Sequence, residues 1–127
     1  MTNQVNIMPM IALRGTTVLP EMIVHFDVSR EKSIRAVEAA MLHDQKVFLL
    51  TQKDPEVETP ELDDLYRVGT IAYIKQVVKL PQDLYRVLVE GLDRAEILSL
   101  EQEGPYLKAE CEIVTAQEEE YPETVKD

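Results

Sequence analysis

Few side chains in this sequence could hold a metal ion or act as a nucleophile. His25, His43 and Cys111 are the only imidazole and thiol groups in the 127 residues. A structural zinc site uses about four such ligands at short spacings, whereas these three are scattered along the chain. We therefore expect no metal site, solvated structural roles for the two histidines, and a half-buried packing role for Cys111.

Phosphate binding and acid/base catalysis also lack their residue patterns. A phosphate-cradling loop clusters glycines ahead of a lysine, because only glycine lets backbone N–H groups close around the anion. The four glycines are widely dispersed here, and no Gly-Lys pair occurs. The densest carboxylates, at 63–64 and 118–120, lie in polar stretches that offer no burial, and Ser29 and Ser99 have no evident base beside them. We expect a chain with no catalysis and no cofactor of its own.

The net charge of −11 is concentrated in two short segments. Residues 54–66 carry −6 and residues 118–127 carry −4. Because no basic stripe remains to contact phosphates, nucleic acids and anionic membranes are not expected partners. We interpret the acidic segments as solvated linkers, with a docking site for a basic partner as the alternative. Neither a signal-peptide pattern nor an apolar run of about 20 residues occurs, so we expect a cytoplasmic location.

One helix is predicted, over residues 30–43. Ser29 can cap it, and Glu31 lies in the first turn, where a negative charge suits the helix dipole. Apolar side chains recur at helical spacing and form a stripe that should pack on a sheet. These side chains are Ile34, Val37 and Met41, with Ala40 beside them.

Short strands with turn residues between them make up the rest of the predicted fold. Strands are expected at 8–13, 22–28, 47–51, 70–80, 84–90, 94–100 and 106–114, turns at 81–83, 91–93 and 104–105, and a long loop at 54–64. The continuous apolar run 47–51 is typical of a central strand covered on both faces. Pro9 lacks an N–H, so the first strand should not be central throughout. The pattern predicts an α+β domain with a β-rich coiled or barrel-like sheet and one main helix.

The length suits a single domain with one core. We place this domain at residues 1–116. Residues 117–127 have lost the apolar periodicity and are expected to be an acidic linker towards a region outside this chain.

Several segments resemble, in order, the amino-terminal substrate-binding domain of bacterial Lon ATP-dependent proteases. The first half of the resemblance consists of MPMIALRG at 8–15, VLPEM at 18–22 and VSREKS at 28–33. The second half consists of GTIAYIKQ at 69–76, LP at 80–81 and RVLVEGLDRA at 86–95. Ala12, Ser29 and the pair Gln82-Asp83 depart from the family pattern, in which Pro, Gly and Asp-Gly are common at these places. None of these departures removes a chemical group.

The resemblance implies a PUA-like fold and a role in protein quality control and the stress response. Such a domain would recognise unfolded or damaged protein segments and help organise a hexamer. It would leave ATP, Mg²⁺ and Ser-Lys peptidase chemistry to AAA+ and protease domains that this chain lacks. An alternative is a stand-alone Lon-like domain that binds a small molecule or one fixed protein partner. RNA binding by analogy with the fold is disfavoured by the charge distribution.

Apolar residues beside two of the turns are the candidate substrate-binding residues. They form one patch of Leu19, Pro20 and Met22 and another of Leu80, Pro81 and Leu84. A core cannot easily cover every aliphatic group beside a turn, and methionine adapts to varied apolar partners. The competing interpretation is that these residues only close the ends of the sheet.

Overall fold

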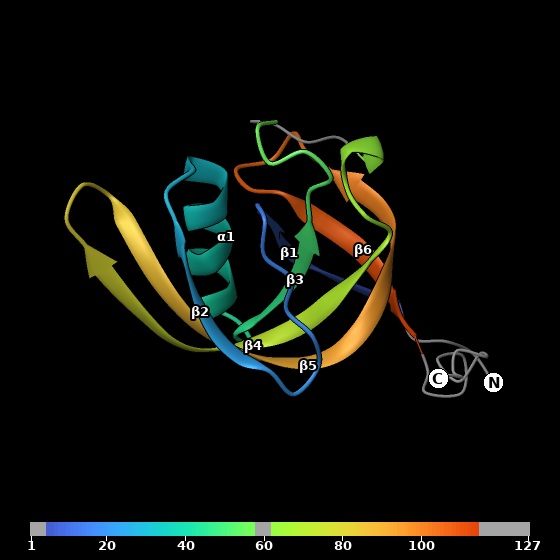
Figure 1. The fold of residues 1–127 in the computed structure, drawn as a ribbon, viewed down its shortest axis with the longest axis horizontal. Helices are drawn as coiled ribbons and strands as arrows, with labels where there is room; N and C mark the ends of the chain where they lie inside the picture. The colour runs from blue at the N-terminus through green and yellow to red at the C-terminus, as the bar shows by residue number, and fades with distance from the viewer. Residues whose placement is uncertain (1–4, 58–61, 115–127) are drawn as a thin grey trace.

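A computed structural model describes residues 5–57 and 62–114, in which a curved sheet packs against one helix (Figure 1). The elements are β1 (Val5–Leu13), β2 (Ile23–Val28), α1 (Glu31–Met41), β3 (Lys46–Thr51), the short 3₁₀ helix η1 (Leu62–Asp64), β4 (Val68–Leu80), β5 (Leu84–Glu101) and β6 (Lys108–Ile113). The predicted β-rich α+β fold with one main helix is confirmed. The predicted boundary at residue 116 and the segment 117–127 lie outside the described residues.

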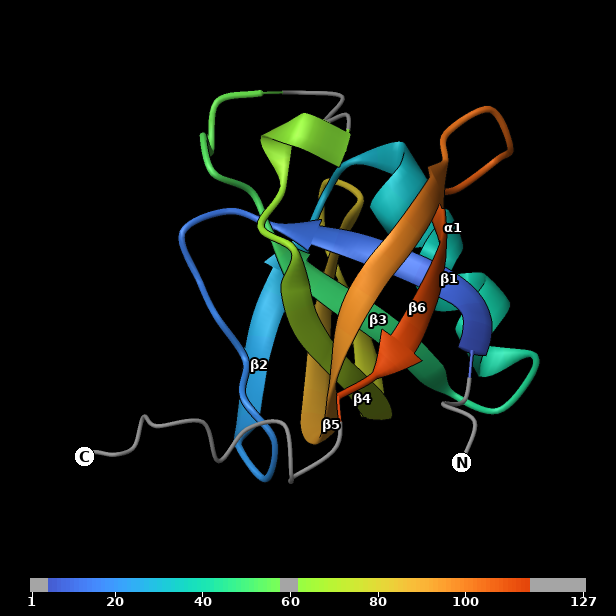
Figure 2. The ribbon, with the colours of Figure 1, turned by 90° about the vertical axis from the view of Figure 1, so that its right-hand side faces the viewer.

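The sheet closes into a ring with one additional strand attached to it. The strand order is β2-β5-β4-β3-β1-β6, and β6 pairs again with β5. Five strands therefore form the ring, while β2 extends the sheet beyond it (Figure 2). β1 and β3 run parallel, and the other pairings are antiparallel. We call the three strands β2, β5 and β4, over residues 23–28, 84–90 and 73–80, the wing.

β5 is a single strand of 18 residues, so the turn predicted at 91–93 is wrong. Its first half pairs with β2 and its second half with β6, while β4 lies along the other edge. Gly91 is buried within this strand, where an added Cβ would lie 2.2 Å from Leu19 O. Gly69, in β4, would place a Cβ at the same distance from Leu49 O. Both glycines permit close approach of backbones rather than a reversal of the chain.

β1 and β3 are covered on both faces, which confirms that the run 47–51 is a central strand. Alternate residues of each strand enter two different cores. The core beneath α1 contains Ile11, Leu13, Val47 and Leu49, and the core inside the ring contains Met10, Ala12, Phe48 and Leu50. The expectation for Pro9 is also confirmed, because residues 5–9 of β1 pair with β6 and residues 10–13 pair with β3.

α1 begins one residue later than predicted and presents a different face to the sheet. Arg30, and not Ser29, is the N-cap residue, and no side chain caps the helix. The Arg30 guanidinium instead donates to Ala12 O at 2.7 Å and so joins the start of the helix to β1. Met41 is 40% exposed, so the predicted stripe is wrong at its carboxyl end. The buried residues are Ser33, Ala36, Val37 and Ala40, whose small side chains let the helix lie close to β1 and β3.

The long acidic loop is held at both of its described ends. Gln52 is buried, and its side-chain amide donates to Asp54 O and Val57 O, each at 3.0 Å. Leu65 is fully buried in the ring core immediately after η1. Residues 58–61 of the predicted loop lie outside the described residues.

Candidate functional site

The loop between β1 and β2 exposes part of the first predicted patch. Leu19 is 48% exposed and Met22 is 37% exposed, whereas Pro20 is half-buried. Met22 N–H donates to Leu19 O at 3.1 Å, and the left-handed residue Glu21 (φ 70°) donates its N–H to Gly91 O at 2.9 Å. The close contact with Gly91 thus fixes the turn that presents the two apolar side chains.

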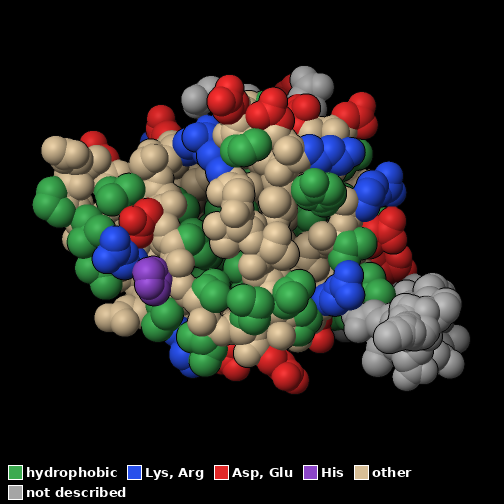
Figure 3. All heavy atoms as spheres, in the orientation of Figure 1, with side chains coloured by type: hydrophobic (Ala, Val, Ile, Leu, Met, Phe, Trp, Pro, Cys, Tyr) green, Lys and Arg blue, Asp and Glu red, His purple; other side chains and the backbone are tan. Residues whose placement is uncertain are grey.

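The second predicted patch lies at the tip of the β4–β5 hairpin, which projects from the body in Figure 1. Leu80 and Leu84 are paired across the turn and are half-buried, while Pro81 is exposed. Gln82 and Asp83 both have positive φ, at 68° and 59°, which confirms the predicted tight turn. Figure 3 shows hydrophobic side chains over this hairpin at the left of the molecule.

The two patches lie at opposite ends of β2 and do not meet. The β2–β5 register runs from Ile23 opposite Glu90 to Val28 opposite Tyr85. The Leu19 turn precedes this pairing and the hairpin tip lies beyond it. Six strand residues span about 20 Å, so a single apolar side chain of a bound substrate could not contact both patches.

A partly apolar sheet surface lies between the two patches, and the sequence interpretation missed it. It is the outward face of the wing, which is turned away from α1 and to which every second side chain of β2 points. Ile23 is 58% exposed, and Tyr73 and Val78 of β4 are also exposed. Their neighbours on this face include the charged pair of Asp27 and Arg86. The alternation of side chains along β2 indicated that one face of this strand points outward. Which strands lie beside β2 could not be known from the sequence.

Asp27 and Arg86 make a bidentate ion pair between β2 and β5. Arg86 Nε donates to Asp27 Oδ1 at 2.9 Å, and Nη2 donates to Oδ2 at 3.2 Å. This hydrogen bonding lowers the pKa of the Asp27 carboxyl and raises the pKa of the Arg86 guanidinium. The pair joins β2 to β5 at the end of β2 nearest the hairpin.

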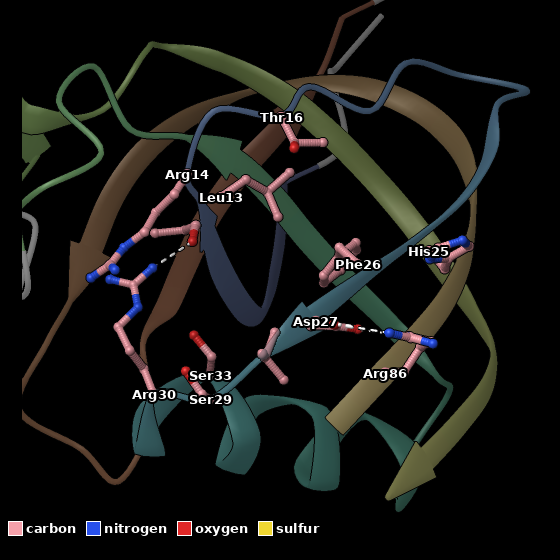
Figure 4. A pocket seen from close by; sticks show the side chains of 12 residues that line it. Leu13, Arg14, Thr16, His25, Phe26, Asp27, Ser29, Arg30, Ser33 and Arg86 are labelled. Atoms are coloured by element: carbon pink, nitrogen blue, oxygen red, sulfur yellow. Dashed lines mark hydrogen bonds and ion pairs between the residues drawn. The ribbon is translucent and has the colours of Figure 1, made fainter. Parts of the chain in front are cut away.

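A cavity of about 480 Å³ lies between β2, the end of β1 and the start of α1 (Figure 4). Residues 25–29 line one side, and Ala12, Leu13 and the following loop line another. Three guanidinium groups border it, from Arg14, Arg30 and Arg86, together with the carboxylate of Asp27. We call this hollow the arginine cavity. Its polar walls and open mouth suit a charged or hydrogen-bonding ligand better than a purely apolar one.

The two histidines and the cysteine are not assembled into a reactive site in the described part of the chain. Cys111 is fully buried in the ring core, more deeply than the half-buried position predicted, and burial raises the pKa of its thiol to about 11. No cluster of three His, Cys, Asp or Glu residues suited to a metal occurs within 5–57 and 62–114. The helix in these ranges is too short to cross a bilayer.

Comparison with known proteins shows which family shares this architecture. Residues 7–127 match the family model described as the ATP-dependent protease La (LON) substrate-binding domain. The chain belongs to this family. A Lon protease of Lachnoclostridium phytofermentans is 58% identical over 103 residues, which are 81% of this chain and 13% of the relative. A Lon protease of Clostridium acetobutylicum is 52% identical over 109 residues, which are 85% of this chain and 14% of the relative.

Solved structures support the same fold. The N-terminal domain of a Mycobacterium avium complex Lon protease superposes with a TM-score of 0.69 at 23% identity, covering 87% of this chain and 55% of that chain. A Lon N-terminal domain protein from Xanthomonas campestris gives a TM-score of 0.66 at 11% identity, covering 87% of this chain and 60% of that one. The chain spans only about a seventh of the length of its full-length relatives, at 13–14%.

Proposed function

We propose that this chain is the non-catalytic substrate-recognition module of an ATP-dependent Ser-Lys protease and binds unfolded or damaged protein segments. The observation that carries the proposal is the exposure of Leu19 and Met22 on a fixed turn in a member of a substrate-binding family. Exposed apolar groups on a well-packed domain attract the apolar segments that unfolding reveals in other proteins.

The remaining roles of the whole protease belong to this proposal as well. ATP and Mg²⁺ would bind in an AAA+ domain, and peptide cleavage would take place in a protease domain, both outside this chain. The module would contribute to self-association of a hexamer located in the cytoplasm. Relatives named Lon protease, of which this chain matches about a seventh, support this division of roles.

Binding of a permanently unfolded protein tests the proposed function. Fluorescently labelled α-lactalbumin, reduced and carboxymethylated so that it cannot refold, is titrated with the 127-residue chain. We expect saturable binding of this probe and much weaker binding of native, disulfide-bonded α-lactalbumin. Equal affinity for the two forms, or no binding of the unfolded form, would contradict the proposal.

A further inference from the structure

β2 has one backbone edge that no other strand covers in the described part of the chain. It pairs with β5 alone, at the end of the strand order. Residues 25–28 of β2 also line the arginine cavity. The cavity therefore runs along the free edge of this strand and is more than a hollow between side chains (Figure 4).

The register identifies which backbone groups face the cavity. Gly91 N–H donates to Met22 O at 2.9 Å, and these two residues adjoin the first pair of the register, Ile23 and Glu90. Because hydrogen-bonded pairs alternate along an antiparallel ladder, Val24, Phe26 and Val28 direct their N–H and C=O groups to β5. Ile23, His25 and Asp27 then direct theirs to the free edge.

The opposite wall of the cavity is a strand edge that is already capped. Leu13 O accepts from Gln52 N–H at 2.8 Å on the β3 side of β1, so the preceding carbonyl, Ala12 O, faces the other way. The Arg30 guanidinium donates to Ala12 O at 2.7 Å. The end of β1 thus has a side-chain partner on its outer edge, which leaves β2 as the edge in this cavity that can take a strand.

We propose that an extended segment of a non-native protein adds to the free edge of β2 as an extra strand, with an acidic side chain directed to the arginine cavity. This proposal rests on the proposed function and names how the substrate is held. Backbone N–H and C=O groups spaced along a strand are matched by another extended backbone, whatever its side chains. Recognition through the backbone suits a module that must accept many sequences.

The charge of the cavity selects among such segments. Arg14, Arg30 and Arg86 line it together with Asp27, and a guanidinium keeps its positive charge while it is hydrogen-bonded, as that of Arg30 is to Ala12 O. An acidic side chain on the added strand is attracted to this surplus of positive charge, and a basic one is repelled. The volume of about 480 Å³ can hold part of a strand and its side chains.

The substitution His25→Pro tests strand addition, with His25→Ala as its matched control. Proline removes the N–H that faces the free edge and no hydrogen bond to β5, and it is tolerated on edge strands. Both variants lose the imidazole, so they differ in the backbone donor. We expect His25→Pro to bind unfolded α-lactalbumin at least about fivefold more weakly than His25→Ala, as the loss of one hydrogen bond predicts.

Amide hydrogen exchange of the unsubstituted chain keeps the test valid if His25→Pro does not fold. Bound probe should slow the exchange of the Ile23, His25 and Asp27 amides, while those of Val24, Phe26 and Val28 are protected already in the free chain. Binding of the probe without slower exchange at these three amides would overturn strand addition, as would equal affinity of His25→Pro and His25→Ala for the probe. Either result would leave the proposed function standing. Absence of any probe binding would overturn both.

A pair of short synthetic peptides tests the charge preference. Each peptide alternates Val and Thr, and the central residue is Glu in one and Lys in the other. We expect the Glu peptide to bind at least about threefold more tightly at low salt, with the difference shrinking as salt screens the charges. Equal or tighter binding of the Lys peptide would overturn the acidic preference.

Discussion

At the scale of single residues, the two predicted patches differ in what their side chains can contribute. Met22 is exposed on a turn whose shape depends on backbone hydrogen bonds, whereas Leu84 is half-buried opposite Leu80 at the hairpin tip. Exposed and half-buried positions therefore separate within the predicted patches. The predicted apolar turn neighbours are a mixture of the two.

Replacing Met22 and Leu84 by serine distinguishes binding from packing. Met22→Ser should weaken binding of unfolded α-lactalbumin by about 1–2 kcal/mol. Because Met22 is only 37% exposed and its Sδ accepts from Leu19 N–H at 3.4 Å, the substitution should also lower the thermal midpoint slightly. Leu84→Ser should weaken binding and also lower the midpoint by several degrees. Leu42→Ser is the control, since Leu42 is 82% exposed at the end of α1 and belongs to neither patch. Unchanged affinity in both patch variants would eliminate the patches as binding sites.

Cys111 should be inert in the folded chain. Burial raises the pKa of its thiol to about 11, above the ordinary value of about 8.5 in an unfolded chain. The stability that the neutral thiol contributes is therefore fully present below about pH 8.5 and is lost as the pH rises towards 11. Iodoacetamide at pH 8 should label the chain in denaturant and not in buffer. Rapid labelling of the native chain would show that the thiol is accessible.

At the scale of elements, local patterns predicted where strands and the helix lie but not how one strand continues. Gly91-Leu92-Asp93 has the composition of a turn, yet β5 continues through it with an irregularity in its pairing to β4, and Gly91 lies against the backbone of Leu19. The helix was located correctly, and its buried face was misjudged in part because small residues pack more closely than the larger Met41. Both differences arise from contacts distant in sequence.

Gly91→Ala tests whether that close approach determines the course of β5. The new methyl carbon would lie 2.2 Å from Leu19 O, so the loop or the strand must move. We expect a loss of about 1–3 kcal/mol in the free energy of unfolding, measured by urea denaturation. Gly104→Ala is the matched control, because the nearest atom to its Cβ is 3.7 Å away. Equal stability of the two variants would mean that the Leu19 loop yields without cost.

At the scale of the whole molecule, the candidate site depends on strand order, which the sequence does not encode locally. Turn composition predicted the two apolar patches. The wing between them, and the free edge of β2 beside the end of β1, arise only when the ring closes through β5 and β6 and leaves β2 outside. A sequence pattern can show that residues 22–28 form a strand, but it cannot show that the strand has a single neighbour.

The whole-molecule charge predicts how the chain responds to nucleic acid, a partner that the charge distribution in the sequence already disfavours. Binding to phosphate backbones depends on many cations that release counterions, and its affinity falls steeply with salt. The net charge here is −11, with −6 in residues 54–66 and −4 in residues 118–127. The arginine cavity supplies only three guanidinium groups. We therefore expect no salt-sensitive gel shift of structured RNA or duplex DNA at moderate ionic strength, under conditions in which unfolded α-lactalbumin binds. A micromolar shift that weakens with added salt would show that local charge outweighs the net charge and would restore nucleic acid as a partner.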